Sequence, residues 1–315
     1  MSTTTASTTP TTAVTGPAEA RTATPPVRLG KAKGGDNSPR SIAFAMALWF
    51  SLLFAVLFLV ILIGDLVIRG GARIDLTLFT AYPGPVPEEA GARPAILGSM
   101  WVIGTTAVLA IPLGIAAAIH LEEFADKTNR FNRFVELNVQ NLASVPAIVY
   151  GLLTLSLLSM LSVTNRNMVI VGAMALALLI LPVIIISTRE ALRAVPMEIR
   201  QGSLALGATP LQTVMRQTLP AAVPGIATGA ILALSRALGE AAPLLLLGGL
   251  VFLRFDPNGL ASGYTTLPIQ IFNWTSRPQP GFHVLAAASS LVLLALLLTM
   301  NSVAIYIRNK FQQRW

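Results

Sequence analysis

The chain has 315 residues, of which 54% are hydrophobic and only 11% are charged. Soluble domains carry about a quarter charged residues, so this composition excludes an ordinary soluble protein and predicts one that crosses a membrane. The chain contains no cysteine, which excludes disulfides, thiolate metal sites and cysteine nucleophiles.

Residues 1–40 come first and differ from the rest of the chain. They are rich in Thr, Ala, Pro and Gly with scattered Arg and Lys, and no run among them is apolar enough to cross a bilayer or build a core. We predict a disordered cytoplasmic tail over residues 1–40 and a transmembrane domain over residues 41–315.

Six apolar windows follow, and each approaches the roughly 20 residues that a spanning helix needs. They predict an all-α membrane protein with about six transmembrane helices, at Ile42–Leu66, Pro94–His120, Val139–Leu161, Met168–Ser187, Ala222–Leu253 and Val284–Ile307. The first half of the third window is polar, and without that window the chain crosses five times.

The distribution of basic residues predicts the orientation. With six crossings, 15 of the 22 Lys and Arg residues lie on one side and 6 on the other. The positive-inside rule then places both termini in the cytoplasm, in a multi-pass protein of the inner membrane. The net charge of +8 therefore reflects topology and some attraction to anionic membrane lipid, and a nucleic-acid partner is not expected.

The cytoplasmic loop over residues 196–220 carries strong helix signals. Pro196 suits a first helical turn, and Glu198 complements the positive end of a helix. Gly207 can close a helix in the left-handed conformation, and Thr209 to Gln212 reads as a capping box with proline at the first helical position. The loop is therefore predicted to be a helix, a tight turn and a second helix.

Two charged residues, Arg236 and Glu240, lie near the middle of the fifth window. Their spacing of four places both side chains on one face of a helix. A charge at the bilayer centre costs at least about 2.5 kcal/mol, so both should face protein or a water-filled pathway. A guanidinium matches the oxygens of phosphate or sulfate, so Arg236 is a candidate for contact with an anionic substrate. Glu240 is a candidate for holding Arg236, and a purely structural salt bridge is the alternative.

The cytoplasmic loop over residues 196–220 resembles the EAA loop of ABC importer permeases. Gly207 and Leu219-Pro220 stand at the spacing of that family, whereas Gln201-Gly202-Ser203 replaces its acidic-alanine-alanine opening. The resemblance implies that this loop docks into a cytoplasmic ATPase subunit and transmits its closure to the membrane helices.

The stretch from Arg93 to the carboxyl terminus resembles the PstA-type permeases of phosphate ABC importers. The resemblance rests on NLASVPAIVYGLL (Asn141–Leu153), STREALRAVP (Ser187–Pro196), ALSRALGEAAPLLL (Ala233–Leu246) and LPIQIFNWTSRPQ (Leu267–Gln279). It implies a type I, MetI-like permease that translocates inorganic phosphate by alternating access. It also implies a PstC-type sister permease, two ATPase subunits and an extracytoplasmic phosphate-binding protein, with Asn273, Trp274 and Arg277 in contact with the binding protein.

No catalytic constellation or metal site is predicted. The phosphate-binding loop G-x-x-x-x-G-K-[ST] is missing, so the chain is not expected to be an enzyme, and ATP and Mg²⁺ are expected in the partner ATPase and not on this chain. Three alternatives remain: a permease for another oxyanion such as sulfate or molybdate, a secondary transporter driven by an ion gradient with Glu240 as a proton site, and a scaffold that reports phosphate supply to a signalling kinase.

Overall fold

The computed structural model describes residues 39–126, 128–249 and 252–311. Apart from one isolated bridge between Met168 and Gly263, every regular element within these residues is a helix. The predicted tail lies outside the described residues as far as residue 38. The chain divides into two units, residues 1–57 and 58–315.

In the first unit, residues 39–57 form the first part of helix α1 (Pro39–Gly70). Large apolar side chains project all round this part of the helix and are exposed, among them Trp49, Phe50 and Phe54. A helix that is apolar on every face suits a lipid or protein environment and not water. The first apolar window is therefore confirmed as a helix long enough to cross a membrane.

The second unit begins within α1 and contains all the other helices of the described residues. In chain order they are η1 (Gly71–Arg73), α2 (Leu76–Thr80), α3 (Arg93–Ile119), η2 (His120–Phe124), α4 (Arg130–Leu142), α5 (Ala147–Met160), α6 (Val169–Arg193), α7 (Met197–Ala205), α8 (Pro210–Thr213), η3 (Val214–Thr218), α9 (Leu219–Gly239), α10 (Ala242–Leu246), α11 (Leu267–Thr275) and α12 (Pro280–Phe311). Of these, η1 is a 3-10 turn, whereas η2 and η3 are π-helical turns.

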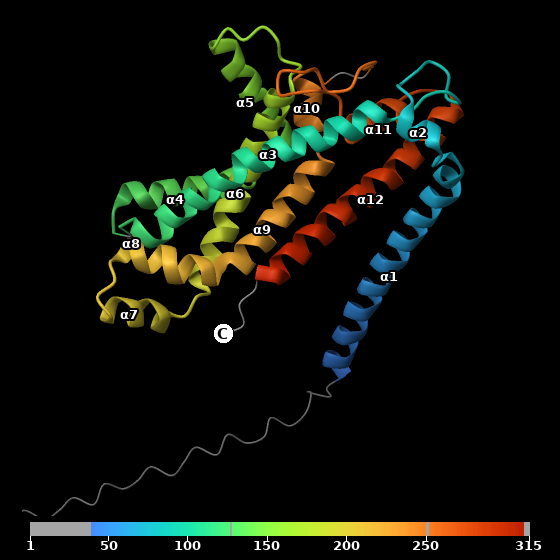
Figure 1. Ribbon diagram of the computed structural model, residues 1–315. Coiled ribbons are helices and arrows are strands. Elements are labelled where there is room, and N and C mark those ends of the chain that lie inside the picture. The colour runs from blue at the N-terminus through green and yellow to red at the C-terminus, as the bar shows by residue number, and fades with distance from the viewer. Residues whose placement is uncertain (1–38, 127, 250–251, 312–315) are drawn as a thin grey trace, which may run out of the picture. The chain divides into compact units, whose positions relative to one another are not determined.

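Four long helices, α3, α6, α9 and α12, build the centre of this unit (Figure 1). Helix α6 packs against both α3 and α9, and α12 packs against α9. Small residues allow the close approach: a Cβ atom on Gly114 of α3 would lie 2.6 Å from the Ile184 side chain, and one on Gly229 of α9 would collide with Ser187. Small residues at contacts are the usual device by which membrane helices pack, because lipid supplies no hydrophobic force between them.

The two ends of this unit differ. At one end, called the α11 end, α2 and α11 pack with the start of α12 around Leu78, Trp274 and Phe282. The opposite end, called the α7 end, carries α7 and α8 together with the last turn of α3 (Figure 1). Ion pairs occur at both ends, including Arg93 with Asp256 at 2.6 Å near the α11 end.

The predicted spans can now be compared with the helices. The first, second, fourth and sixth windows are confirmed, and five helices among the described residues are long and apolar enough to cross a membrane, or six if α4 and α5 count as one broken span.

The third window is not a straight span, because α4 and α5 are bent by 114°. Pro146, at the N-cap of α5, has no N–H to continue α4. The Tyr150 hydroxyl of α5 also stabilises the bend, because it donates a hydrogen bond to the carbonyl of Leu142 in α4 at 2.7 Å.

The prediction of one continuous fifth helix over Ala222–Leu253 is wrong. Helix α9 ends at Gly239, and the short helix α10 starts again at Ala242. Glycine is a weak helix former, and Pro243 can neither donate a hydrogen bond to the preceding turn nor favour a helical residue before it. The chain therefore breaks inside its apolar window.

Candidate functional site

The first candidate site lies at the break after α9. Arg236 stands in the last turn of α9, whereas Glu240 follows the helix in an extended conformation. The two side chains still meet, with Arg236 Nε 3.8 Å from Glu240 Oε1, although the expected shared helix face is absent because the helix ends first. At this distance the two groups form an ion pair, but they are too far apart for a hydrogen bond. Since no hydrogen bond joins the Arg236 guanidinium to another described residue, its donors remain available to an anion.

The two side chains differ in exposure, at 43% for Arg236 and 25% for Glu240. Glu240 also lines a cavity of about 10 Å³, together with Ser99, Thr266 and others. The Thr266 hydroxyl is buried and has no hydrogen-bond partner among the described residues. A space of this size holds about one water molecule. Glu240 therefore borders a small and mostly apolar interior space, while Arg236 is the more open member of the pair.

The second candidate site is the loop between α6 and α9. Helix α7 starts directly after Pro196, with Glu198 in its first turn, and Gly207 adopts a φ of +84° after its end. The predicted capping box is present: Gln212 N donates to Thr209 Oγ1 at 3.3 Å, and Thr209 N donates to the Gln212 side chain at 3.0 Å. The helix–turn–helix prediction for this loop is confirmed.

Some side chains of the loop join its two helices, and others are exposed on its surface. The hydroxyls of Ser203 and Thr213 lie 2.9 Å apart and join α7 to α8. Gln201 and Gly202 are exposed, and Leu206 is 91% exposed at the tip. A groove of about 440 Å³ runs between the two helices and is lined in part by Gly202 and Ser203. The loop thus presents an apolar tip beside a groove on a rigid support.

The second helix of the loop does not stop at Pro220. Residues Pro210–Gly239 form one uninterrupted helical run of 30 residues, through α8, η3 and α9. The π-helical turn η3 immediately precedes Leu219 and Pro220. Pro220 has no backbone N–H and would therefore disturb a regular helix at this point. At 1.5 Å per residue the run is about 45 Å long. The loop is therefore joined directly to the helix that carries Arg236.

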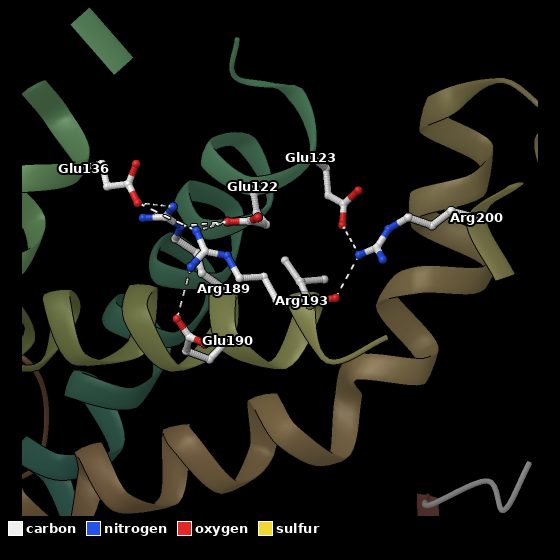
Figure 2. A network of polar contacts seen from close by, with 8 residues as sticks. Glu122, Glu123, Glu136, Arg189, Glu190, Arg193 and Arg200 are labelled. Atoms are coloured by element: carbon white, nitrogen blue, oxygen red, sulfur yellow. Dashed lines mark hydrogen bonds and ion pairs between the residues drawn. The ribbon is translucent and has the colours of Figure 1, made fainter. Parts of the chain in front are cut away.

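A third group of residues was not predicted from the sequence. Arg189, near the end of α6, is only 6% exposed and contacts two carboxylates, Glu122 of η2 at 3.1 Å and Glu136 of α4 at 2.7 Å (Figure 2). Arg193, one turn later, lies 2.9 Å from Glu122 and 3.3 Å from Glu190. A cavity of about 260 Å³ adjoins this cluster.

The neighbouring carboxylate, Glu123, contacts a different helix. It accepts a hydrogen bond from Arg200 of α7 at 2.8 Å (Figure 2). Arg200 also donates to the backbone carbonyls of Leu192 and Val195, both at 2.8 Å, and so caps the end of α6. The signal in the sequence was the clustering of acidic and basic residues just beyond the apolar windows, but spacing alone could not pair them.

The three predicted contact residues for a binding protein lie at the α11 end. Trp274 has no exposed surface and packs against Phe282 and its neighbours, so its side chain is not available to a partner in this structure. Arg277 stacks on Phe282, with its guanidinium carbon 4.3 Å from the ring centre, and donates to the carbonyl of Gly84 at 3.4 Å. Asn273 is partly buried.

The sequence from residue 110 to residue 315 matches a family described as the binding-protein-dependent transport system inner membrane component. The chain belongs to this family. The probable ABC transporter permease protein YqgI of Bacillus subtilis is 31% identical over 78% of this chain and 87% of its own length. The phosphate transport system permease protein PstA 1 of Mycobacterium tuberculosis is 34% identical over 71% of this chain and 73% of its own length.

Solved structures confirm the predicted type I, MetI-like architecture of this permease. A chain of the bacterial alginate ABC transporter superposes with a TM-score of 0.64 at 16% identity, over 86% of this chain and 95% of that one. A chain of the MetNI methionine ABC transporter gives 0.56 at 19% identity, over 69% and 94%. The permease is thus a membrane subunit of an ABC importer, as the family resemblance implied, and it is multi-pass, as its apolar windows predicted.

Proposed function

We propose that this permease forms half of the membrane pathway of an ATP-driven importer of inorganic phosphate and works by alternating access. In this proposal it pairs with a PstC-type sister permease above two cytoplasmic ATPase subunits, which bind ATP and Mg²⁺. An extracytoplasmic phosphate-binding protein delivers the substrate at the α11 end, and both termini lie in the cytoplasm. The relatives named as phosphate permeases support this choice of substrate.

The observation that carries the proposal is the state of Arg236. Its charge is permanent, it lies inside an apolar window, and its partner Glu240 is 3.8 Å away. A charge inside an apolar window is costly unless its side chain faces protein or a water-filled pathway. An oxyanion would bring the hydrogen-bond acceptors that Arg236 lacks among the described residues. Glu240 would hold the guanidinium in place between transport events.

The loop at the α7 end supplies the coupling to the ATPase. In the proposal, Gln201, Gly202, Ser203 and the apolar tip dock into the ATPase, and Gly207 sets the angle between the two helices. Leu219 and Pro220 lie within the run that continues to Arg236, so a movement of the docked tip is transmitted along a helix and not along a flexible linker.

At the α11 end, Asn273 and Arg277 are the proposed contacts with the binding protein. Trp274 lies behind them and supports the surface from within. Arg277 keeps part of its side chain accessible while Phe282 and Gly84 hold its position.

The test is uptake of labelled phosphate by the complete transporter with Arg236→Gln. Charge-assisted hydrogen bonds contribute about 1.5 to 3 kcal/mol each, so uptake should fall roughly tenfold or more. Arg69→Gln is the matched control, because Arg69 also forms an ion pair four residues away, with Asp65 at 2.7 Å, but is well exposed at the end of α1. Membrane abundance and ATPase assembly are measured for both variants.

Three results would contradict the proposal. Normal uptake by Arg236→Gln would remove Arg236 from the pathway. Equal competition by sulfate in the wild type would favour a permease for another oxyanion. Uptake that survives inactivation of the ATPase but collapses with the proton gradient would favour a secondary transporter.

A further inference from the structure

The turn η2, at the end of α3, places two adjacent carboxylates against different helices. Glu122 contacts Arg189 at 3.1 Å and Arg193 at 2.9 Å, both on α6. Glu123 contacts Arg200 of α7 at 2.8 Å (Figure 2). A single turn therefore ties the loop helix α7 to the buried end of α6.

The same arginines extend this connection to α4. Glu136 of α4 lies 2.7 Å from Arg189 and 3.7 Å from Arg193. Both Arg189 and Glu122 are almost fully buried, at 6% and 5% exposed. Buried pairs are held in one geometry, because breaking one leaves an uncompensated charge in a medium of low dielectric. These contacts define an ionic linkage, namely Glu122, Glu123, Glu136, Arg189, Arg193 and Arg200.

From α4 the chain leads toward α10. The Tyr150 hydroxyl fixes the bend between α4 and α5 by its hydrogen bond to Leu142. On the next residue, Gly151, a Cβ atom would lie 2.8 Å from Pro243 Cα, so α5 rests directly on the backbone of α10. The ionic linkage thus continues through α4 and α5 to the helix that follows Glu240.

Two routes consequently join the loop to the break in the fifth window. One is the unbroken run from Pro210 to Gly239, which ends just before Glu240. The other runs from α7 through the ionic linkage, α4 and α5, and reaches α10 just after Glu240. The two sides of the break are therefore positioned by two different helices of the same loop.

We propose that the ionic linkage is the second arm of coupling: it moves α4, α5 and α10 with α7, so that the segment flanking Glu240 opens only when both arms move. Arg189 is its central positioning residue, because its guanidinium donates hydrogen bonds to the carboxylates of both η2 and α4. This inference rests on the proposed function, in which the loop receives the movement of an ATPase.

The test uses the complete transporter in proteoliposomes with Arg189→Met combined with Glu122→Gln. The double variant removes the charges of Arg189 and Glu122 together, so that neither residue is left as a buried charge after the loss of the other. Arg189→Lys is the conservative variant, since a lysine can reach one carboxylate but does not provide the planar fork that spans two. Glu190→Gln is the matched control: it lies on the same helix, is 66% exposed and contacts Arg193 from the surface.

The first readout is phosphate transported per ATP hydrolysed. The double variant should keep its binding-protein-stimulated ATP hydrolysis but transport about fivefold less phosphate per ATP, as expected from a coupling energy of ordinary size. Arg189→Lys should recover part of the ratio, and Glu190→Gln should match the wild type. Proportional loss of hydrolysis and transport, or an unchanged ratio, would overturn the proposal.

The second readout is movement, measured with spin labels in partners stripped of cysteine, since this chain has none. One label pair joins Met160 of α5 to Leu298 of α12, and the other joins Leu232 of α9 to Leu298; all three side chains are exposed. On adding ATP, both distances should change in the wild type. In the double variant the α9 distance should still change and the α5 distance should not.

These outcomes separate the two proposals. If wild-type uptake does not depend on ATP, the proposed function fails and so does the linkage built on it. If the wild type is coupled and the α5 distance changes equally in the double variant, only the second arm is refuted.

Discussion

Glu240 owes its position to its neighbours on either side. Gly239 ends α9, and Pro243 prevents α9 from continuing. Glu240 is therefore left in an extended conformation between two helices, α9 and α10, that both pack on α6. The sequence indicated the ion pair with Arg236, since a spacing of four is visible in one dimension. It did not indicate the break, because a long apolar window that contains prolines, here Pro224 and Pro243, is also typical of a kinked but continuous membrane helix.

Glu240→Gln should affect uptake far less than Arg236→Gln. A carboxylate cannot attract phosphate, and a partly exposed pair at 3.8 Å contributes at most about 1 kcal/mol, which corresponds to roughly a fivefold effect. Phosphate uptake at matched membrane abundance measures the difference. If Glu240→Gln abolished uptake while Arg236→Gln did not, Glu240 would be the functional charge, as the hypothesis of a proton site requires.

At the scale of elements, the α7–α8 loop was well predicted and the ionic linkage was not. Gly207, Thr209 and Gln212 act within a few residues of one another, so local chemistry determines the turn. Arg189, by contrast, meets partners that lie 53 and 67 residues away along the chain. Which acid meets which base depends on how α3, α4 and α6 pack, and no periodicity in the sequence encodes that pairing.

The closing turn of the loop can be tested with two glycines. A Cβ atom on Gly207 would meet nothing within 4 Å, but its φ of +84° would cost an alanine roughly 1 to 2 kcal/mol. Gly202 is also unobstructed but lies within α7, so alanine there should stabilise the helix by roughly 0.5 to 1 kcal/mol.

Hydrogen exchange of the α7 and α8 amides measures both changes. The amides of Gly207→Ala should exchange faster and this variant should lose ATPase on purification, whereas the amides of Gly202→Ala should exchange more slowly. Equal behaviour of the two variants would show that the left-handed turn does not control the geometry of the loop.

At the scale of the whole molecule, the apolar windows predicted the class and nearly all the spans, because lipid imposes length and composition on any helix that crosses it. The orientation of the termini remains a prediction from the distribution of basic residues. Phe131 of α4 and Phe255 of the segment before α11 are both exposed, and they lie on opposite sides in the proposed topology.

Single cysteines at these two positions test the orientation, since the chain contains no other. In cells with an intact inner membrane but a permeable outer envelope, an impermeant maleimide should label Phe255→Cys at once. Phe131→Cys should react only after the inner membrane is opened. The reverse pattern would place both termini outside the cytoplasm.

The π-helical turn η3 has a consequence for rotation. A π-helical turn holds about one residue more than an α-helical turn, and each residue of an α-helix advances the chain by about 100°. The five residues Val214–Thr218 therefore fit one extra residue into the rotation of about one turn, between the loop tip and the face of α9 that carries Arg236. Deleting one of them should convert the turn to a regular helix and leave the guanidinium of Arg236 pointing in nearly its present direction, whereas a deletion in an α-helical part of the run should rotate it by about 100°. The turn thus marks the place where the run between the loop and Arg236 can lose a residue without reorienting the guanidinium.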